Sequence, residues 1–330
     1  MNPYQRRRQA ETWAAEQAGL ASWESEPVSS DASFRSYYRL MSKGHSLVVM
    51  DAPPEREPVT AFLDIAQRLR SAGLHAPQIK GADPDRGFVL LEDLGRRPYH
   101  HVLDLDNADA LFEDALTALR IMQTMVDIED LPAYDPARLL QELALFPDWF
   151  LEHHWQVEPS EDELDAWDHL CALLIRWALD QPQVFCHRDF MPRNLMLTEP
   201  NPGIIDFQDA VVGPISYDPV CLFRDAFLSW PQARVDAWLE GYRVAGRADG
   251  LALPESADLW RRTCDFMGVQ RHLKVIGIFA RIRYRDGKPA YLEDVARFFA
   301  YLDQAIARNP ELAPLKQLLV AWRARRRDSQ

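Results

Sequence analysis

The amino-acid sequence predicts an α+β fold of two unequal lobes, in which a small, strand-rich amino-terminal lobe precedes a larger, mostly helical lobe. Short apolar runs of strand length, separated by turn residues, characterise residues 1–94. Apolar residues recur at helical spacing over most of residues 95–330. A second strand-rich stretch, 184–207, interrupts these helices. We therefore expect the first lobe to end at residue 94, with a hinge at about 92–97.

Length and composition agree with a two-lobed globular protein. The chain has 330 residues, of which 47% are hydrophobic and 26% charged. Its net charge of −13 argues against a nucleic-acid partner, because binding to phosphates needs a basic surface. Four cysteines without metal-site spacing indicate reduced thiols. Neither a signal peptide nor an apolar run of membrane-spanning length is evident. We expect a cytoplasmic protein with no membrane or obligate protein partner.

Local patterns predict the elements of the amino-terminal lobe. Residues 7–20 have the spacing of a short amphipathic helix, and residues 60–71 that of a second helix. Residues 37–50 read as two strands joined by a turn at 42–44. The apolar run at 87–92 predicts a buried strand that leads into the hinge.

Helix start signals and apolar stripes predict the second lobe. An apolar stripe marks residues 111–126 as a helix, and Asp135, followed by proline, begins another. Ser160 and Glu163 have the spacing of a capping box. Asp218, which precedes a proline, is expected to cap the next helix. Further helices fit residues 219–230, 256–285, 291–307 and 311–324.

The second strand-rich stretch surrounds the segment CHRDFMPRN at residues 186–194. An apolar strand at 184–186 leads into this segment, and a hairpin with strands at 195–197 and 203–207 follows it. The segment matches H-R-D-x-x-x-x-N, the pattern of a kinase catalytic loop. A chance match of this whole pattern between apolar strands is rare, whereas a lone Asp or His would be a cap or a satisfied polar group.

Each residue type in this pattern suits one task in phosphoryl transfer. Asp189 would accept a hydrogen bond from the acceptor hydroxyl and take its proton. Asn194 and Asp206, at the end of the second hairpin strand, supply the hard oxygen ligands that Mg²⁺ prefers. His187 is expected to hold the loop rather than act on substrate. The pattern therefore predicts a kinase that uses ATP and Mg²⁺, and no P-loop motif competes with it.

The loop, the hairpin, the following IIDFQDAVVGPISYD and the helical carboxy-terminal half resemble the aminoglycoside phosphotransferase family, a branch of the protein-kinase-like fold. The resemblance covers nearly the whole chain. It implies the bilobal kinase fold, with ATP at the hinge and adenine bonded to hinge backbone, for which Glu92 and Leu94 are the candidates.

Five segments are similar to a narrower group within that family, the anomeric amino-sugar kinases of Gram-negative bacteria. These segments are SSDASFRSYYRL, VVMDAPPE, FVLLEDLG, HRDFMPRNLM and QRHLKVIGIFARIRYRDGK. This similarity implies phosphorylation of the C1 hydroxyl of N-acetylmuramate and N-acetylglucosamine in peptidoglycan recycling. A kinase of aminoglycosides or of other small-molecule hydroxyls is the first alternative. A non-catalytic nucleotide-binding scaffold is the second, although the intact Asp189, Asn194 and Asp206 argue against it.

The phosphate-binding parts depart from the kinase pattern. In place of a glycine-rich loop the chain has small and polar residues, in which Ser30, Ser33, Phe34 and Arg35 are the candidate nucleotide contacts. An ordinary polar hairpin is the competing interpretation. The strand at 47–51 also lacks the usual lysine.

Other residues could fill the roles that these departures leave open. Arg35, Arg39 and Lys43 are the nearby cations that could replace the lysine, and Glu57 or Asp64 could be the acidic partner. Where protein kinases have Asp-Phe-Gly, this chain has Asp-Phe-Gln. Without the glycine the segment has less freedom to change conformation, which suggests an enzyme that is less readily switched between conformations than a protein kinase.

Two residues are candidates for contact with the substrate. Trp149 belongs to an aromatic group at 146–155 that could cover the apolar face of a sugar ring, although such residues more often form core. Arg193 lies inside the catalytic loop. It could pair with the lactyl carboxylate of N-acetylmuramate or with the transferred phosphate, and a salt bridge within the lobe is equally compatible with its position.

Overall fold

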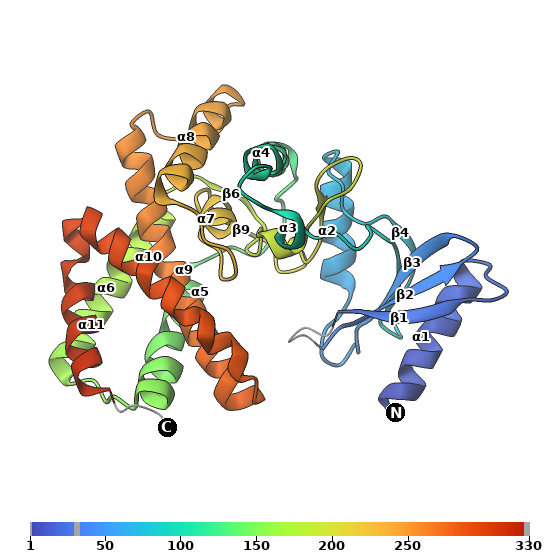
Figure 1. Ribbon diagram of the computed structural model, residues 1–330, viewed down its shortest axis with the longest axis horizontal. Coiled ribbons are helices and arrows are strands. Elements are labelled where there is room, and N and C mark those ends of the chain that lie inside the picture. Colours follow the sequence, from blue (N-terminus) through green and yellow to red (C-terminus); the bar gives the residue numbers. More distant parts are fainter. Residues whose placement is uncertain (1, 30–33, 327–330) are drawn as a thin grey trace. The chain divides into compact units, whose positions relative to one another are not determined.

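The computed structural model describes residues 2–29 and 34–326 (Figure 1). Contacts between Cα atoms divide the chain into two compact units, which we describe separately. Unit 1 comprises Met1–Asp127 and Arg193–Asp209, and unit 2 comprises Ile128–Pro192 and Ala210–Gln330. The lobe boundary expected after residue 94 stays a prediction.

Unit 1 contains the strand-rich part of the chain. Its elements are α1 (Pro3–Gln17), β1 (Glu24–Ser29), β2 (Ser36–Ser42), β3 (His45–Asp51), α2 (Thr60–Ser71), β4 (Ile79–Asp83), β5 (Phe88–Glu92), α3 (Tyr99–Val102), α4 (Ala108–Met125), β7 (Leu195–Met196) and β8 (Gly203–Ile204). The 3-10 turn η2 (Pro192–Asn194) precedes β7.

Unit 2 contains a two-stranded sheet and the long helices. Its elements are α5 (Pro136–Leu145), the π-helix η1 (Phe146–Trp155), α6 (Glu161–Leu179), β6 (Gln183–Cys186), β9 (Val211–Pro214), α7 (Tyr217–Phe223), α8 (Gln232–Ala248), α9 (Ala257–Asp286), η3 (Pro289–Asp294), α10 (Val295–Arg308), η4 (Pro310–Leu312) and α11 (Ala313–Arg325). Among the helices of the described ranges, none is long and apolar enough to cross a membrane.

The main sheet of unit 1 has five antiparallel strands in the order β1-β2-β3-β5-β4. The predicted hairpin at 37–50 is confirmed: Ser42 pairs with His45 across a two-residue turn. Lys43 and Gly44 form that turn with φ values of 49° and 81°, as the tightest hairpin turns require. The predicted strand at 87–92 is confirmed as β5.

The sequence-based prediction gives no bounds for the two outer strands, β1 and β4. Strand β1 contains Pro27, which donates no hydrogen bond and is tolerated at a sheet edge, where the register with β2 also shifts. Strand β4 reads IKGAD and lacks a strong apolar alternation. Edge strands of this kind carry little sequence signal because only one side is paired.

Helix α1 covers one face of this sheet. Ala10, Trp13 and Ala14 are buried in one cluster with Val49 of β3 and Leu90 of β5. The helix begins four residues earlier than the predicted 7–20 because the Asn2 side chain accepts a hydrogen bond from Tyr4 N and proline occupies the first turn. Helix α2 has the predicted bounds, and its apolar stripe is buried.

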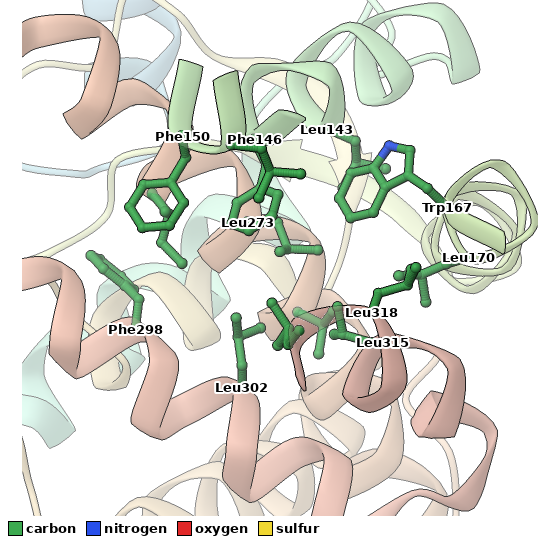
Figure 2. Close-up of a cluster of buried hydrophobic side chains, with 14 of the residues drawn as sticks. Leu143, Phe146, Phe150, Trp167, Leu170, Leu273, Phe298, Leu302, Leu315 and Leu318 are labelled. Carbon is green, nitrogen blue, oxygen red and sulfur yellow. The ribbon is translucent and has the colours of Figure 1, made fainter. Parts of the chain in front are cut away.

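The hydrophobic core of unit 2 gathers around α9 (Figure 2). Its members include Leu143, Phe146, Phe150, Trp167, Leu170, Leu273, Phe298, Leu302, Leu315 and Leu318. Helix α9 approaches the end of α5 so closely that a Cβ added at Gly277 would lie 2.4 Å from the carbonyl carbon and oxygen of Leu145. Only glycine fits there without displacement of the backbone.

Two of the predicted helix start signals of unit 2, at Asp135 and at Ser160, are confirmed. Asp135 accepts a hydrogen bond from Arg138 N at 2.8 Å, and Ser160 and Glu163 form both bonds of the capping box. After α5 the helix widens into the π-helix η1, where Pro147 has no N–H for the ordinary pattern.

The predicted helix at 219–230 is wrong in its second half, because α7 ends at Phe223. Asp225 accepts a hydrogen bond from Ala226 N at 2.6 Å, a local bond that competes with helix continuation. Helix α8 is missing from the prediction. Its buried residues Val235, Leu239 and Tyr242 have helical spacing, which is the signal that identifies it.

Candidate active site

The candidate catalytic loop leaves strand β6, which pairs with β9. His187 is fully buried, and its Nδ1 accepts a hydrogen bond from Asp189 N at 3.3 Å. Its ring meets the Phe190 ring edge-on, with centroids 5.8 Å apart. The prediction that His187 supports the loop is confirmed.

Asp218 holds the backbone of this loop. Its Oδ2 accepts a hydrogen bond from His187 N at 2.7 Å, and its Oδ1 accepts one from Arg188 N at 2.9 Å. Asp218 is fully buried, and burial raises its pKa, although His187 and the two N–H groups act in the opposite direction. The prediction that Asp218 caps the next helix is wrong, because its carboxylate is bonded to the catalytic loop and α7 begins without a side-chain cap.

Asp189 is half-buried, and its carbonyl oxygen accepts a hydrogen bond from Met191 N at 2.9 Å. The residue before it, Arg188, has a φ of 74°, in the left-handed region that non-glycine residues seldom adopt. The base candidate therefore follows a strained residue that Asp218 holds in place.

The two candidate metal ligands lie together in unit 1. Asn194 Nδ2 is 3.3 Å from Asp206 Oδ2, and Ile205 N donates to Asn194 O at 3.0 Å. Gln208 Nε2 donates to Asp206 Oδ1 at 2.8 Å. An amide beside a carboxylate offers two hard oxygen ligands once the amide presents its oxygen, which fits Mg²⁺. In the described ranges no cluster of three or more His, Cys, Asp or Glu side chains could hold a metal ion.

The candidate phosphate-binding segment is described only in part. Ser30 and Ser33 lie outside the described residues. Phe34 is exposed, with the Arg56 guanidinium 4.5 Å from its ring centroid. Arg35 Nε lies 3.1 Å from Glu57 Oε2. A candidate to replace the strand lysine thus pairs with a candidate for its acidic partner.

The other cations have different surroundings. Arg39 is buried, and its guanidinium donates to both carboxylate oxygens of Asp93 and to the Gly95 carbonyl. It thus ties β2 to the segment after β5. Lys43 lies in the exposed hairpin turn. Asp64 pairs with Arg68 on the same helix.

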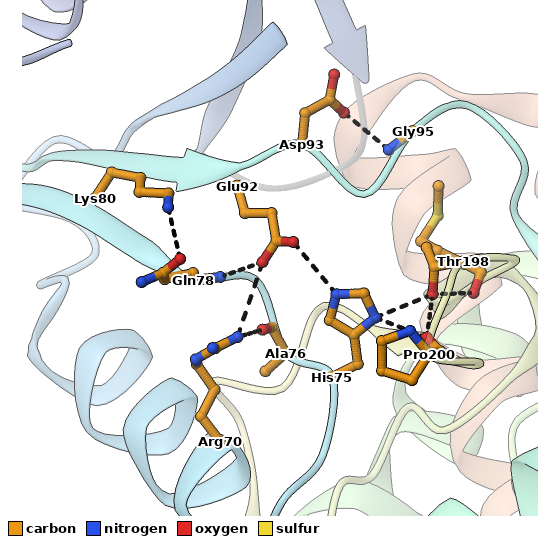
Figure 3. A network of polar contacts seen from close by, with 11 residues as sticks. Arg70, His75, Ala76, Gln78, Lys80, Glu92, Asp93, Gly95, Thr198 and Pro200 are labelled. Carbon is orange, nitrogen blue, oxygen red and sulfur yellow. Dashed lines mark hydrogen bonds and ion pairs between the residues drawn. The ribbon is translucent and has the colours of Figure 1, made fainter. Parts of the chain in front are cut away.

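Glu92 is the centre of a polar network at the end of β5 (Figure 3). Its Oε2 accepts a hydrogen bond from Gln78 N at 3.0 Å, and its Oε1 lies 3.4 Å from His75 Nε2. His75 Nδ1 in turn contacts the Pro200 carbonyl at 2.8 Å and Thr198 Oγ1 at 3.2 Å. Burial opposes the charge of Glu92, but these hydrogen bonds lower its pKa below the usual value. Through His75, the Glu92 side chain thus connects β5 to the turn of the β7–β8 hairpin.

The remaining candidates occupy separate positions. Leu94 is 9% exposed and lies against β8, since a Cβ added at Gly203 would be 2.9 Å from Leu94 Cδ1. Trp149 is half-buried on η1 and packs on the core of unit 2, with its ring 4.9 Å from that of His153. Arg193 is half-buried in the turn η2.

Sequence reasoning overlooked three residues that shape these sites. They are Asp218 for its bond to the loop, Gln208 for its bond to Asp206, and Glu142, which pairs with Arg188. Gln208 follows the motif aspartate by two positions, which is a usable signal. Glu142 is far from the catalytic loop in the sequence, and only the folded structure brings it into contact with Arg188.

Comparison with known proteins agrees with this arrangement. Residues 24–260 match the model of a family described as "Phosphotransferase enzyme family". A Pseudomonas aeruginosa protein named N-acetylmuramate/N-acetylglucosamine kinase is 56% identical over 295 residues, which cover 89% of this chain and 87% of that protein. A Pseudomonas putida protein of the same name is 50% identical over 297 residues, 90% of this chain and 88% of that protein.

A solved structure supports the fold. The ADP-bound aminoglycoside phosphotransferase APH(2'')-Ib superimposes with a TM-score of 0.59 at 17% identity, and the match covers 90% of this chain and 98% of that one. This likeness confirms the predicted kinase-like α+β fold. Because the family model extends from β1 into α9 and the relatives cover nearly the whole sequence, the chain belongs to the phosphotransferase enzyme family.

Proposed function

We propose that this chain is an ATP-dependent anomeric kinase, which phosphorylates the C1 hydroxyl of N-acetylmuramate and N-acetylglucosamine during peptidoglycan recycling in the cytoplasm. The observation that carries the proposal is the half-buried Asp189, on a loop held by His187 and Asp218. The names of the relatives at 56% and 50% identity support the choice of sugars.

Asp189 acts as the base in this proposal. The anomeric hydroxyl is more acidic than an ordinary alcohol, so a carboxylate can accept its proton without a large change in pKa. Asp189 also orients that hydroxyl for attack on the γ-phosphorus of ATP. As the new bond forms, the bond to the bridging oxygen breaks and ADP leaves.

Asn194 and Asp206 are the proposed ligands of Mg²⁺. When bound, the ion neutralises charge on the β- and γ-phosphates. Gln208 keeps the Asp206 carboxylate oriented through its hydrogen bond.

The nucleotide contacts in this proposal come from unit 1. Arg35, paired with Glu57, takes the place of the strand lysine and its glutamate, and Ser30, Ser33 and Phe34 belong to the segment that covers the phosphates. Arg39 is less suited because Asp93 already neutralises it. The hinge backbone at Glu92 and Leu94 contacts adenine, with the Glu92 side chain bracing the hinge.

Trp149 and Arg193 are the proposed substrate contacts. Trp149 covers a sugar face, and Arg193 pairs with the lactyl carboxylate, which N-acetylglucosamine lacks. Arg193→Ala should then reduce kcat/KM for N-acetylmuramate more than for N-acetylglucosamine, by about 10-fold to 100-fold. Equal losses on both sugars would instead indicate a contact with the transferred phosphate or a structural role.

The product tests the whole proposal. A coupled ATPase screen should show turnover with N-acetylmuramate and N-acetylglucosamine, and little with choline, homoserine or kanamycin. Phosphorus NMR of the product should show an acid-labile phosphate that couples to H1 of the sugar. A phosphate at C6, or rapid turnover of kanamycin alone, would overturn the assignment.

A further inference from the structure

Unit 2 contains a buried ionic cluster that the proposed reaction does not use directly. Its centre is Glu142 on α5, which is 8% exposed. Around it lie Arg188 from the catalytic loop, Lys274 from α9, and the polar side chains of Tyr134 and Gln270. The cluster thus connects the catalytic loop to two helices of the same unit.

The contacts of Glu142 occupy both of its carboxylate oxygens. Oε1 accepts from Arg188 Nη2 at 2.5 Å and from Lys274 Nζ at 3.1 Å. Oε2 accepts from the Tyr134 hydroxyl and from Gln270 Nε2, the latter at 3.4 Å. A buried carboxylate with two donors on each oxygen has little freedom to move, so its partners are held as well.

Two cations share this one carboxylate. Burial opposes ionisation of Glu142, but the charges of Lys274 and Arg188 lower its pKa below the usual value. Burial also lowers the pKa of Lys274, which its pairing with Glu142 partly offsets. Removal of the Glu142 carboxylate would leave Arg188 and Lys274 without their counter-charge. This would destabilise the folded state more than removal of one positive and one negative charge together.

The arginine in this cluster is the strained residue of the catalytic loop. Arg188 has a φ of 74°, and a residue in this region costs about 1–3 kcal/mol unless its surroundings hold it there. Asp218 binds its backbone N–H, and Glu142 binds its guanidinium. These two contacts fix the residue on both sides of its Cα, directly before Asp189.

We propose that Glu142 is a positioning residue for the reaction, which acts by anchoring the side chain of Arg188 and thereby directs Asp189 at the acceptor hydroxyl. Lys274 completes the anchor by balancing and orienting the Glu142 carboxylate. The anchor forms when the chain folds and requires no phosphorylated segment to order the loop, in contrast to the activation loop of many protein kinases. This inference depends on the proposed role of Asp189 as the base.

Glu142→Gln tests the anchor, since it removes the charge and nearly preserves the shape. We expect kcat to fall about 100-fold with both sugars, while KM for sugar and for ATP changes less than about threefold, because orientation rather than binding is lost. Arg188→Met should show a similar loss. The double variant should be no worse than the more damaging single variant, because both changes break the same contact.

The matched control is Asp265→Asn, which breaks another buried ion pair that also involves α9. Asp265 Oδ1 lies 2.6 Å from Arg224 Nη2, and both side chains are buried. We expect this variant to lower the melting temperature and to keep kcat within about threefold of wild type. A comparable loss of kcat in Asp265→Asn would overturn the specific role of Glu142.

A second variant keeps the proposal testable if the single variant misfolds. If Glu142→Gln does not fold, Glu142→Gln with Lys274→Met removes one charge of each sign and keeps the net charge of the cluster. Low kcat in this folded variant supports the proposal, and kcat within threefold of wild type refutes it. Asp189→Asn in the same assay distinguishes failure of the proposed base from failure of the proposed anchor. Full activity of Asp189→Asn would contradict the role of Asp189 as the base. An inactive Asp189→Asn together with a fully active Glu142 variant would contradict only the role of Glu142.

Discussion

Two residues of the candidate catalytic motifs, Arg188 and Asp206, have strained backbone conformations. Both have φ in the left-handed region, at 74° and 63° respectively, although neither is glycine. Such conformations persist where neighbouring groups hold them, and they are common at functional sites. Asp218 bonds the backbone of Arg188, while Asn194 and Gln208 contact the carboxylate of Asp206. Hydrogen bonds thus hold the backbone of Arg188 and the carboxylate of Asp206 in place.

The first prediction concerns the base. Asp189→Asn should lower kcat by about 10²–10⁴-fold, because the amide cannot take the proton, while ATP affinity is retained. Steady-state kinetics and nucleotide titration would measure the two effects. Asp168→Asn, at an exposed position on α6, is the control and should behave as wild type. Near-normal turnover by Asp189→Asn would exclude it as the base.

The second prediction concerns the metal. Asp206→Ala should abolish turnover and weaken ATP binding only when Mg²⁺ is present, because the carboxylate is the proposed ligand. Isothermal titration with and without Mg²⁺ measures this difference, and the exposed Asp85→Ala provides the control. Equal Mg-ATP affinity in variant and wild type would contradict the ligand assignment.

At the scale of single elements, sequence patterns succeed where one local signal dominates. Helix α2 has the predicted bounds because its apolar stripe is continuous, and α5 begins at its predicted cap. Predictions fail where tertiary contacts decide the outcome: β1 and β4 are edge strands, and α7 ends early at the local bond of Asp225. Local propensity alone does not contain these contacts.

The third prediction uses two glycines in helices. Gly277→Ala should destabilise the protein by several kcal/mol, on the order of a severe core substitution, because its Cβ would meet the Leu145 backbone at 2.4 Å. Gly241→Ala, in α8, has open space around its Cβ and should stabilise by about 0.5–1 kcal/mol. Urea denaturation would compare the two. Similar free energies of unfolding for both variants would refute the close contact of α9 with α5.

At the scale of the whole molecule, the sequence indicates candidate catalytic residues more readily than the residues that hold them in place. The candidates Asp189, Asn194 and Asp206 stand out because they match the fixed spacing of a kinase catalytic motif. Glu142 and Asp218 were not, because buried partners of a loop come from distant segments and any carboxylate could serve. The side chains that would contact the sugar follow no local sequence pattern, so the sequence alone does not identify them.

The fourth prediction concerns global stability and pH. Burial raises the pKa of Asp225 from 3.8 to about 6, although Arg271 and backbone N–H groups favour its ionised form. The folded state then binds this proton more tightly than the unfolded state. The contribution of Asp225 to stability therefore falls as pH rises between these two pKa values, by at most about 1.4 kcal/mol for each step of one in pH.

Asp225→Asn should remove this dependence and leave the bond to Ala226 N possible. The free energy of unfolding of the variant minus that of wild type should therefore rise through this pH range and level off above it. Urea denaturation at several pH values would measure the difference. A difference that is constant with pH would show that Asp225 does not titrate in this range.

The position of α1 in the chain has a consequence for biosynthesis. This helix covers one apolar face of the five-stranded sheet, and its residues precede every strand of that sheet in the sequence. On the ribosome, the covering helix therefore emerges before β1, and the strands that follow can be covered as they pair. Nascent sheets that expose apolar faces are prone to aggregate, so this order of synthesis shortens the time during which the nascent chain is at risk.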